Sequence, residues 1–108
     1  MKVENIKNNN GNSVKNQFII IDEVAGETTF QSYESTICKI ITKHTCGFDA
    51  LLKIYPDWNY SKTTLKYFYK FLSDYNIPLK NKDEVAYALE CGHCRLDEGI
   101  AVLDGAIY

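Results

Sequence analysis

The chain has 108 residues, a formal net charge of −2, 45% hydrophobic residues and 24% charged residues. These values are ordinary for one soluble globular domain with a real core, and no apolar run approaches the ~20 residues that span a bilayer. The N-terminus, MKVENIKNNNGNS, lacks the apolar centre of a signal peptide. We therefore expect a cytoplasmic protein with no membrane partner.

The first half of the chain predicts a small sheet. Residues 1–16 are polar and rich in Asn, which predicts a flexible segment ahead of a single domain at residues 17–108. Asn16 to Val24 is rich in β-branched residues, as in a buried strand. Thr28 to Lys43 alternates between two mixed faces, which predicts a strand with a bulge or a change of face, paired with the first as a hairpin. Ala50 to Tyr55 is a third candidate strand.

A helix is expected next, because Ser61 is a good N-cap for a segment that runs to about Tyr75. At 100° per residue, the apolar and aromatic side chains fall on one arc, which should be buried: Leu65, Phe68, Tyr69, Phe71, Leu72 and Tyr75. The opposite side of this helix is polar and carries Lys62, Lys66, Lys70 and Ser73.

The C-terminal third predicts a second helix and a hairpin. Asn81, with Glu84 three residues later, marks the start of the helix, and Gly92 marks its end. The tail predicts a final hairpin around Glu98–Gly99. The fold class that we expect is therefore α+β, in one domain: a small antiparallel sheet of three to five strands with two helices.

Four cysteines raise the question of a metal. The CGHC stretch from Cys91 to Cys94 is a C-x-x-C pair, which can share a zinc ion if Cys38, His44 or Cys46 complete a tetrahedron. However, Cys38 falls in a predicted strand, and no second C-x-x-C exists. A redox motif is disfavoured because Cys91 lies at a predicted helix C-terminus, where the helix dipole opposes a thiolate. We predict reduced structural thiols without metal or cofactor, with a zinc site as the alternative.

No pattern of catalytic residues is present. The six Gly are scattered singly, so there is no phosphate-binding loop, and no G-x-S-x-G surrounds a serine. The carboxylates near His93 are simplest to interpret as a solvated rim, because nothing in the sequence places two of them in one pocket. We predict that the protein is not an enzyme.

Charge is unevenly distributed along the chain. Residues 39–82 carry eight Lys against three Asp, and residues 83–108 carry six acids against one Arg. Lys62, Lys66 and Lys70, with Tyr67 and Tyr69, could contact phosphates and stack on bases, although a solvated helix face is the simpler interpretation. A single Arg and an acidic total argue against nucleic acid, since Arg makes most bidentate contacts to bases and phosphates.

Two stretches carry a resemblance to a known group. FQSYESTICKI, and then DWNYSKTTLKYFYKFL, resemble a family of small uncharacterised phage proteins that share an F-x-S-Y strand and a W-x-Y-S-x-T-T helix start with a following F-L. The matching positions are Phe30, Ser32, Tyr33, Trp58, Tyr60, Ser61, Thr63, Thr64, Phe71 and Leu72. The family has no known activity that could be transferred to this chain. The resemblance implies only an origin in a phage or mobile element. Such genes commonly encode accessory proteins that act by stoichiometric binding.

The leading hypothesis is therefore a non-enzymatic phage accessory protein that binds a host protein, such as a nucleic-acid-processing defence effector, in the manner of an anti-CRISPR inhibitor. Its acidic C-terminal third would compete for a positively charged groove, through Asp83, Glu84, Glu90, Asp97, Glu98 and Asp104. The alternative is a small nucleic-acid-binding module that uses the helix face of Lys62, Lys66 and Lys70. A homo-oligomer is compatible with both hypotheses.

Overall fold

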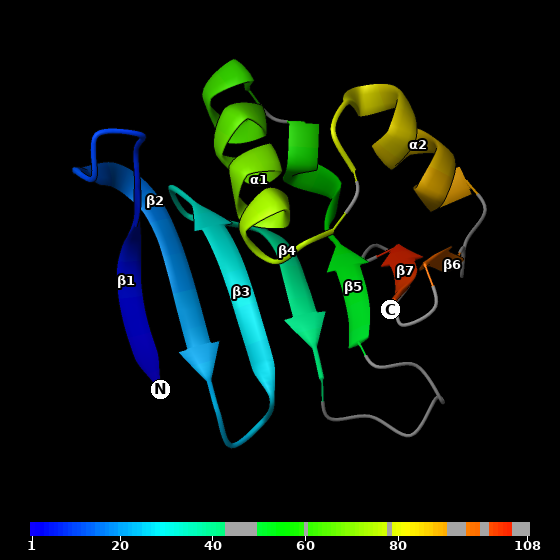
Figure 1. Ribbon diagram of the computed structural model, residues 1–108, viewed down its shortest axis with the longest axis horizontal. Coiled ribbons are helices and arrows are strands. Elements are labelled where there is room, and N and C mark those ends of the chain that lie inside the picture. Colours follow the sequence, from blue (N-terminus) through cyan, green and yellow to red (C-terminus); the bar gives the residue numbers. More distant parts are fainter. Residues whose placement is uncertain (43–49, 60, 78, 91–94, 98–99, 105–108) are drawn as a thin grey trace.

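The structure, a computed structural model, describes the chain except residues 43–49, 60, 78, 91–94, 98–99 and 105–108 (Figure 1). Its elements in chain order are β1 (Lys2–Lys7), β2 (Ser13–Asp22), β3 (Glu27–Ser32), β4 (Ser35–Ile41), β5 (Ala50–Ile54), the 3-10 helix η1 (Pro56–Asn59), α1 (Lys62–Asp74), α2 (Lys82–Glu90), β6 (Arg95–Asp97) and β7 (Ile100–Asp104).

The seven described strands form one sheet in the order β1-β2-β3-β4-β5-β7-β6. Neighbours from β1 to β5 are antiparallel, β7 lies parallel to β5, and β6 pairs antiparallel with β7. The predicted α+β class, the antiparallel pairing of the first strands, the two helices and the C-terminal hairpin are therefore confirmed. β1 to β5 form the expected antiparallel sheet of up to five strands, and the C-terminal hairpin continues this sheet beyond β5.

The N-terminal prediction was wrong, because residues 1–16 are not a flexible segment. β1 pairs with β2 along most of its length, and its Ile6 side chain is buried in the core with 2% exposure. Most other side chains of β1 are exposed, and this polar composition concealed the strand. The burial of Ile6 and the pairing with β2 together order the segment.

The stretch Thr28 to Lys43, predicted as one strand, contains a hairpin of β3 and β4 that ends at Ile41, and Lys43 lies outside the described residues. Tyr33 and Glu34 form its loop, since Ser32 pairs with Ser35. The predicted bulge is present in β4: Phe30 pairs with Cys38 and Gln31 with Thr36, so Ile37 has no partner across the strands. The bulge lets the consecutive residues Ile37 and Cys38 both be buried.

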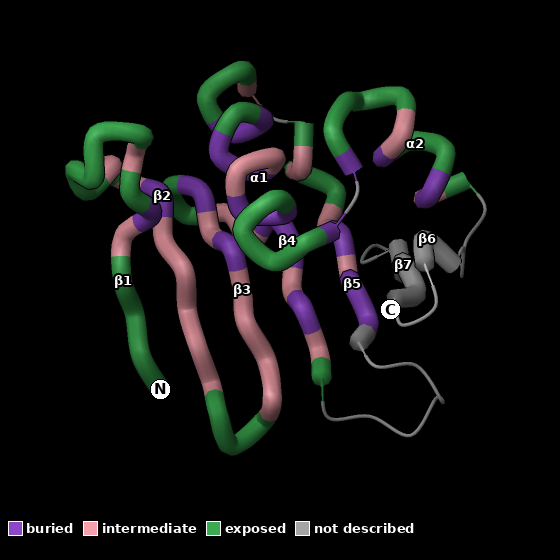
Figure 2. Tube along the Cα trace, viewed as in Figure 1, coloured by how far each residue is buried: buried purple, intermediate pink, exposed green. Residues whose placement is uncertain are grey.

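Both α-helices cover the same face of the sheet and share one apolar core (Figures 1 and 2). Phe30 of β3 stacks on Phe71 of α1, with ring centroids 5.6 Å apart. Val85 and Ala88 are the buried residues of α2. The predicted arc of α1 is buried at Leu65, Phe68, Phe71 and Leu72, whereas Tyr75 is 38% exposed and Tyr67 is buried instead.

The stretches FQSYESTICKI and DWNYSKTTLKYFYKFL, which the sequence singles out, meet in this structure. The buried hydroxyls of Ser32 on β3 and Thr64 on α1 hydrogen-bond, with Oγ and Oγ1 2.9 Å apart. Ser61 caps α1 as predicted: its Oγ accepts the Thr64 N–H at 3.1 Å, and its hydroxyl donates to Thr64 Oγ1 at 3.1 Å. The ring of Trp58 lies 6.2 Å from that of Phe68. These residues fix α1 on the sheet.

The opposite face of the sheet is polar at its centre. Lys39 and Lys53 face one another across β4 and β5, an arrangement that costs free energy unless each charge is compensated. Lys39 Nζ lies 3.0 Å from Glu27 Oε1, and this hydrogen bond raises the pKa of Lys39. Lys53 Nζ lies 5.6 Å from the ring centroid of Tyr55. Both cations thus have compensating contacts.

Candidate functional site

α2 presents an exposed tyrosine between two carboxylates. Asp83, Tyr87 and Glu90 are spaced four and three residues apart, so they share one side of the helix. All three side chains are exposed, Tyr87 to 66%, whereas Val85 and Ala88 on the other side are buried. We call these three residues the acidic stripe. It places a large ring and two negative charges on the exposed side of α2.

The start of α2 is built as the sequence predicts, with one difference. Asn81 Oδ1 accepts the Glu84 N–H at 2.9 Å. Glu84 Oε1 accepts the N–H of Lys80 at 2.9 Å, one residue before the N-cap position that a standard capping box uses. Glu84, predicted as a partner-binding residue, is therefore engaged in holding the helix start, and its side chain is half-buried.

The other three predicted acids follow α2 in the chain. Asp97 ends β6, Asp104 ends β7, and Glu98 lies outside the described residues. β7 is the strand nearest to α2 (Figure 1). Both residues belong to the strands at the β6–β7 edge of the sheet, but they lie at opposite ends of β7, because Asp97 pairs with Ile100 and Asp104 pairs with Ile54. Their side chains are not among those described, so the site rests on α2.

The predicted nucleic-acid face of α1 is only partly open. Lys62 and Lys66 are exposed, but Lys70 Nζ lies 3.5 Å from Asp74 Oδ2 in the next turn. Tyr67, predicted to stack on bases, is 8% exposed. Lys66 Nζ lies 5.3 Å from the Tyr67 ring centroid, so this cation covers the ring rather than leaving it open.

Tyr69, the second predicted stacking residue, packs one ring face near Phe68, with centroids 5.9 Å apart. Its hydroxyl is buried and has no hydrogen-bond partner among the described residues. Burial raises the pKa of Tyr69, and the negative charge of Asp83 raises it further. The first residue of the acidic stripe thus acts electrostatically on this part of α1.

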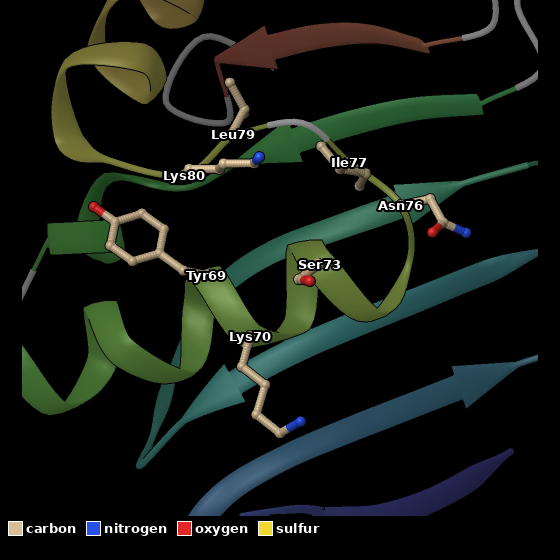
Figure 3. Close-up of a pocket in the computed structure, with 7 residues that line it drawn as sticks. All are labelled: Tyr69, Lys70, Ser73, Asn76, Ile77, Leu79 and Lys80. Atoms are coloured by element: carbon tan, nitrogen blue, oxygen red, sulfur yellow. The ribbon is translucent and has the colours of Figure 1, made fainter. Parts of the chain in front are cut away.

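A hollow of about 530 Å³ lies beside Tyr69, between α1 and the segment that leads to α2 (Figure 3). Ile77 and Leu79 are its buried apolar residues. The other lining residues are Lys70, Ser73, Asn76 and Lys80. Among the described residues that line it there is no carboxylate or histidine that could act as a base for Ser73. The described part of the hollow is an apolar surface with a basic rim.

Cys38 is the one cysteine of the proposed zinc set that the structure describes. It is fully buried in β4, and burial raises the pKa of its thiol, although a backbone hydrogen bond at Phe30 opposes this shift. His44, Cys46, Cys91 and Cys94 lie outside the described residues. Among the residues that are described, no group of His, Cys, Asp or Glu is arranged to hold a metal ion.

Sequence reasoning missed the exposure of three aromatic residues, one of which is Tyr75, predicted to be buried and 38% exposed. Tyr87 was predicted only as part of the second helix, although its spacing from Asp83 and Glu90 and its separation from Val85 mark it as outward-facing. Tyr33 was predicted within a strand, and it instead occupies a turn with 46% exposure. The signal for Tyr87 was present in the helical periodicity, whereas Tyr33 had no comparable signal.

The described residues define a two-layer α+β protein. Its helix α2 carries an exposed tyrosine between two carboxylates. The chain belongs to a family of unknown function (DUF8033), whose model matches residues 1–87. No curated protein and no solved structure matched the chain. None of the helices in the described part is long and apolar enough to cross a membrane.

Proposed function

We propose that this protein is a non-enzymatic accessory protein of a phage or mobile element, which binds a host protein stoichiometrically and inhibits a defence system such as a CRISPR effector. The observation that carries the proposal is the acidic stripe. Tyr is among the residues enriched in interface hot spots, and a ring between two carboxylates suits a basic protein surface. A nucleic-acid groove on a defence effector is such a surface.

The position of the stripe supports a binding role over a structural one. Tyr87 is 66% exposed, and the core contacts of α2 are made by Val85, Ala88 and the partly buried Leu89. Asp83 and Glu90 have no ion pair with any described residue. Their charges are therefore not neutralised within the described molecule and remain available to attract a cationic partner.

The test measures phage plating on a host with an active CRISPR system. Expression of the wild-type protein should raise the plating efficiency. Tyr87→Ala, and separately Asp83→Lys with Glu90→Lys, should abolish this effect, because they remove the ring or reverse the charge. Lys62→Glu with Lys66→Glu is the matched control on α1, and it should retain full inhibition.

Circular dichroism of each variant checks that the fold is kept. The same set is then tested for binding to the purified effector. Unchanged inhibition by the Tyr87→Ala and charge-reversal variants would contradict the role of the stripe. Absence of any inhibition or effector binding by the wild type would contradict the defence-inhibitor assignment itself.

The alternative, a nucleic-acid-binding module, has one supporting observation. Exposed Lys62 and Lys66 lie on α1, and Lys66 and Lys70 line a hollow of about 250 Å³ together with Asn8, Asn9 and Asn10. Under this alternative, neutralising Lys62, Lys66 and Lys70 should flatten a salt-dependent binding curve. No binding of DNA or RNA at low salt would eliminate it. The burial of Tyr67 is why we rank it second.

A further inference from the structure

The loop between β3 and β4 holds a tyrosine in a backbone conformation that tyrosine rarely adopts. Tyr33 has φ of 56°, and a bulky residue in this left-handed region is an outlier. Because Ser32 pairs with Ser35, Tyr33 and Glu34 form a two-residue hairpin loop. Positive φ at its first residue is the type II′ pattern, which favours glycine. Tyr33 thus places an aromatic side chain at a backbone position where folding stability favours glycine.

Hydrogen bonds fix this turn from both sides. The Tyr33 N–H donates to the carbonyl oxygen of Asn16 at 2.7 Å, and Asn16 itself has φ of 66°. The Gln31 side-chain amide donates to the Tyr33 carbonyl oxygen at 2.8 Å. Strained backbone that its surroundings hold in place is a feature of binding sites, and a rigid turn presents its side chains with little further loss of entropy on binding.

The two loop side chains have complementary chemistry. Tyr33 is 46% exposed, and Glu34 beside it is also exposed. Both line a surface hollow of about 390 Å³, together with Asn16 and Ser35. An aromatic face attracts a cation, and a carboxylate accepts two parallel hydrogen bonds from a guanidinium. Arginine meets both requirements better than lysine, because its planar group can stack and donate at once.

We infer that the Tyr33–Glu34 turn is an interaction site that takes an arginine side chain of a protein partner. The chain has a single arginine, Arg95, so a second copy is a poor source of this group and a different protein is the expected partner. The turn joins β3 and β4, whereas the acidic stripe lies on α2. The inference therefore does not depend on the proposed function of the stripe.

The experiment titrates the protein with N-acetyl-arginine amide and follows backbone amides by NMR, with N-acetyl-lysine amide for comparison. Arginine amide should shift residues 31–35 and Asn16, and it should bind more tightly than lysine amide. Tyr33→Gly removes the ring and suits the backbone, so it should keep or raise the melting temperature while weakening binding about tenfold. Tyr33→Phe should bind within about threefold of wild type, because the ring face remains.

Further variants separate the contribution of the carboxylate from that of the ring. Glu34→Gln should weaken binding about fivefold through loss of the charged acceptor, and Tyr87→Ala on α2 should leave the response at Tyr33 unchanged. Tyr33→Asn is a second ring deletion, because asparagine tolerates positive φ. The inference is overturned if both ring deletions bind arginine amide as tightly as wild type. It is also overturned if the shifts occur away from this turn or do not occur.

Discussion

The two helices lie on the same face of the sheet but use their surfaces in opposite ways. α1 buries six residues, among them Phe68, Phe71 and Thr64, whereas α2 buries Val85 and Ala88. The aromatic residue that α2 adds is Tyr87, which is exposed. The comparison teaches that the helix richest in rings is the structural one. A single well-placed ring on the other helix is the stronger candidate for binding.

The largest effect is expected when one core side chain on each helix is truncated and the losses of stability are compared. Phe71→Ala removes a ring that stacks on Phe30, and it should lower the free energy of unfolding by about 3–5 kcal/mol. Val85→Ala on α2 should cost about 1–2 kcal/mol, because it removes less buried surface. Urea unfolding measures both. Equal losses would show that α2 contributes to the core as much as α1 does.

A smaller effect is expected from the hydroxyl cluster that joins α1 to β3. Thr64→Val leaves the buried Ser32 hydroxyl without this partner, which should cost about 1–3 kcal/mol. Thr63→Val is the matched control, because Thr63 is exposed, and it should change stability by less than about 0.5 kcal/mol. In a double-mutant cycle, the variant with both Ser32→Ala and Thr64→Val should lose less unfolding free energy than the sum of the losses in the two single variants.

The smallest effect concerns the start of α2. Asn81→Ala removes the acceptor for the Glu84 N–H and should cost about 1 kcal/mol. Hydrogen exchange of the α2 amides should then accelerate about fivefold. If α2 frays independently, the α1 amides will keep their protection. Equal acceleration in both helices would instead show that they open as one unit.

Local signals were sufficient to predict most of the helical structure. Ser61 and Asn81 cap their helices as expected, because an N-cap acts within one turn. The turn at Tyr33 could not be predicted, since its positive φ is enforced by contacts with Asn16 on another strand. For the same reason, β1 was missed: its order comes from pairing with β2 and the burial of Ile6.

The candidate site was only partly accessible to sequence reasoning. An acidic C-terminal third could be recognised from composition, but composition does not show which acids have structural duties. Glu84 resembles Asp83 and Glu90 in sequence, yet its carboxylate binds the Lys80 N–H. Likewise, the sequence suggests that Tyr67 and Tyr69 could bind a ligand, whereas the structure shows that both rings pack within the protein. Whether a residue belongs to the core or to the candidate site depends on the direction of its side chain, and the residue type alone does not show that direction.

The parallel pairing of β5 with β7 has a consequence for how the protein is made. Ala50 pairs with Ile100, so the outer edge of β5 receives its neighbour only after the C-terminal hairpin has left the ribosome. The strands from β1 to β5 precede it, and an unpaired edge is a template for association with other chains. The family model ends at residue 87, before β6. The segment that finally covers the edge of β5 therefore lies beyond the family match.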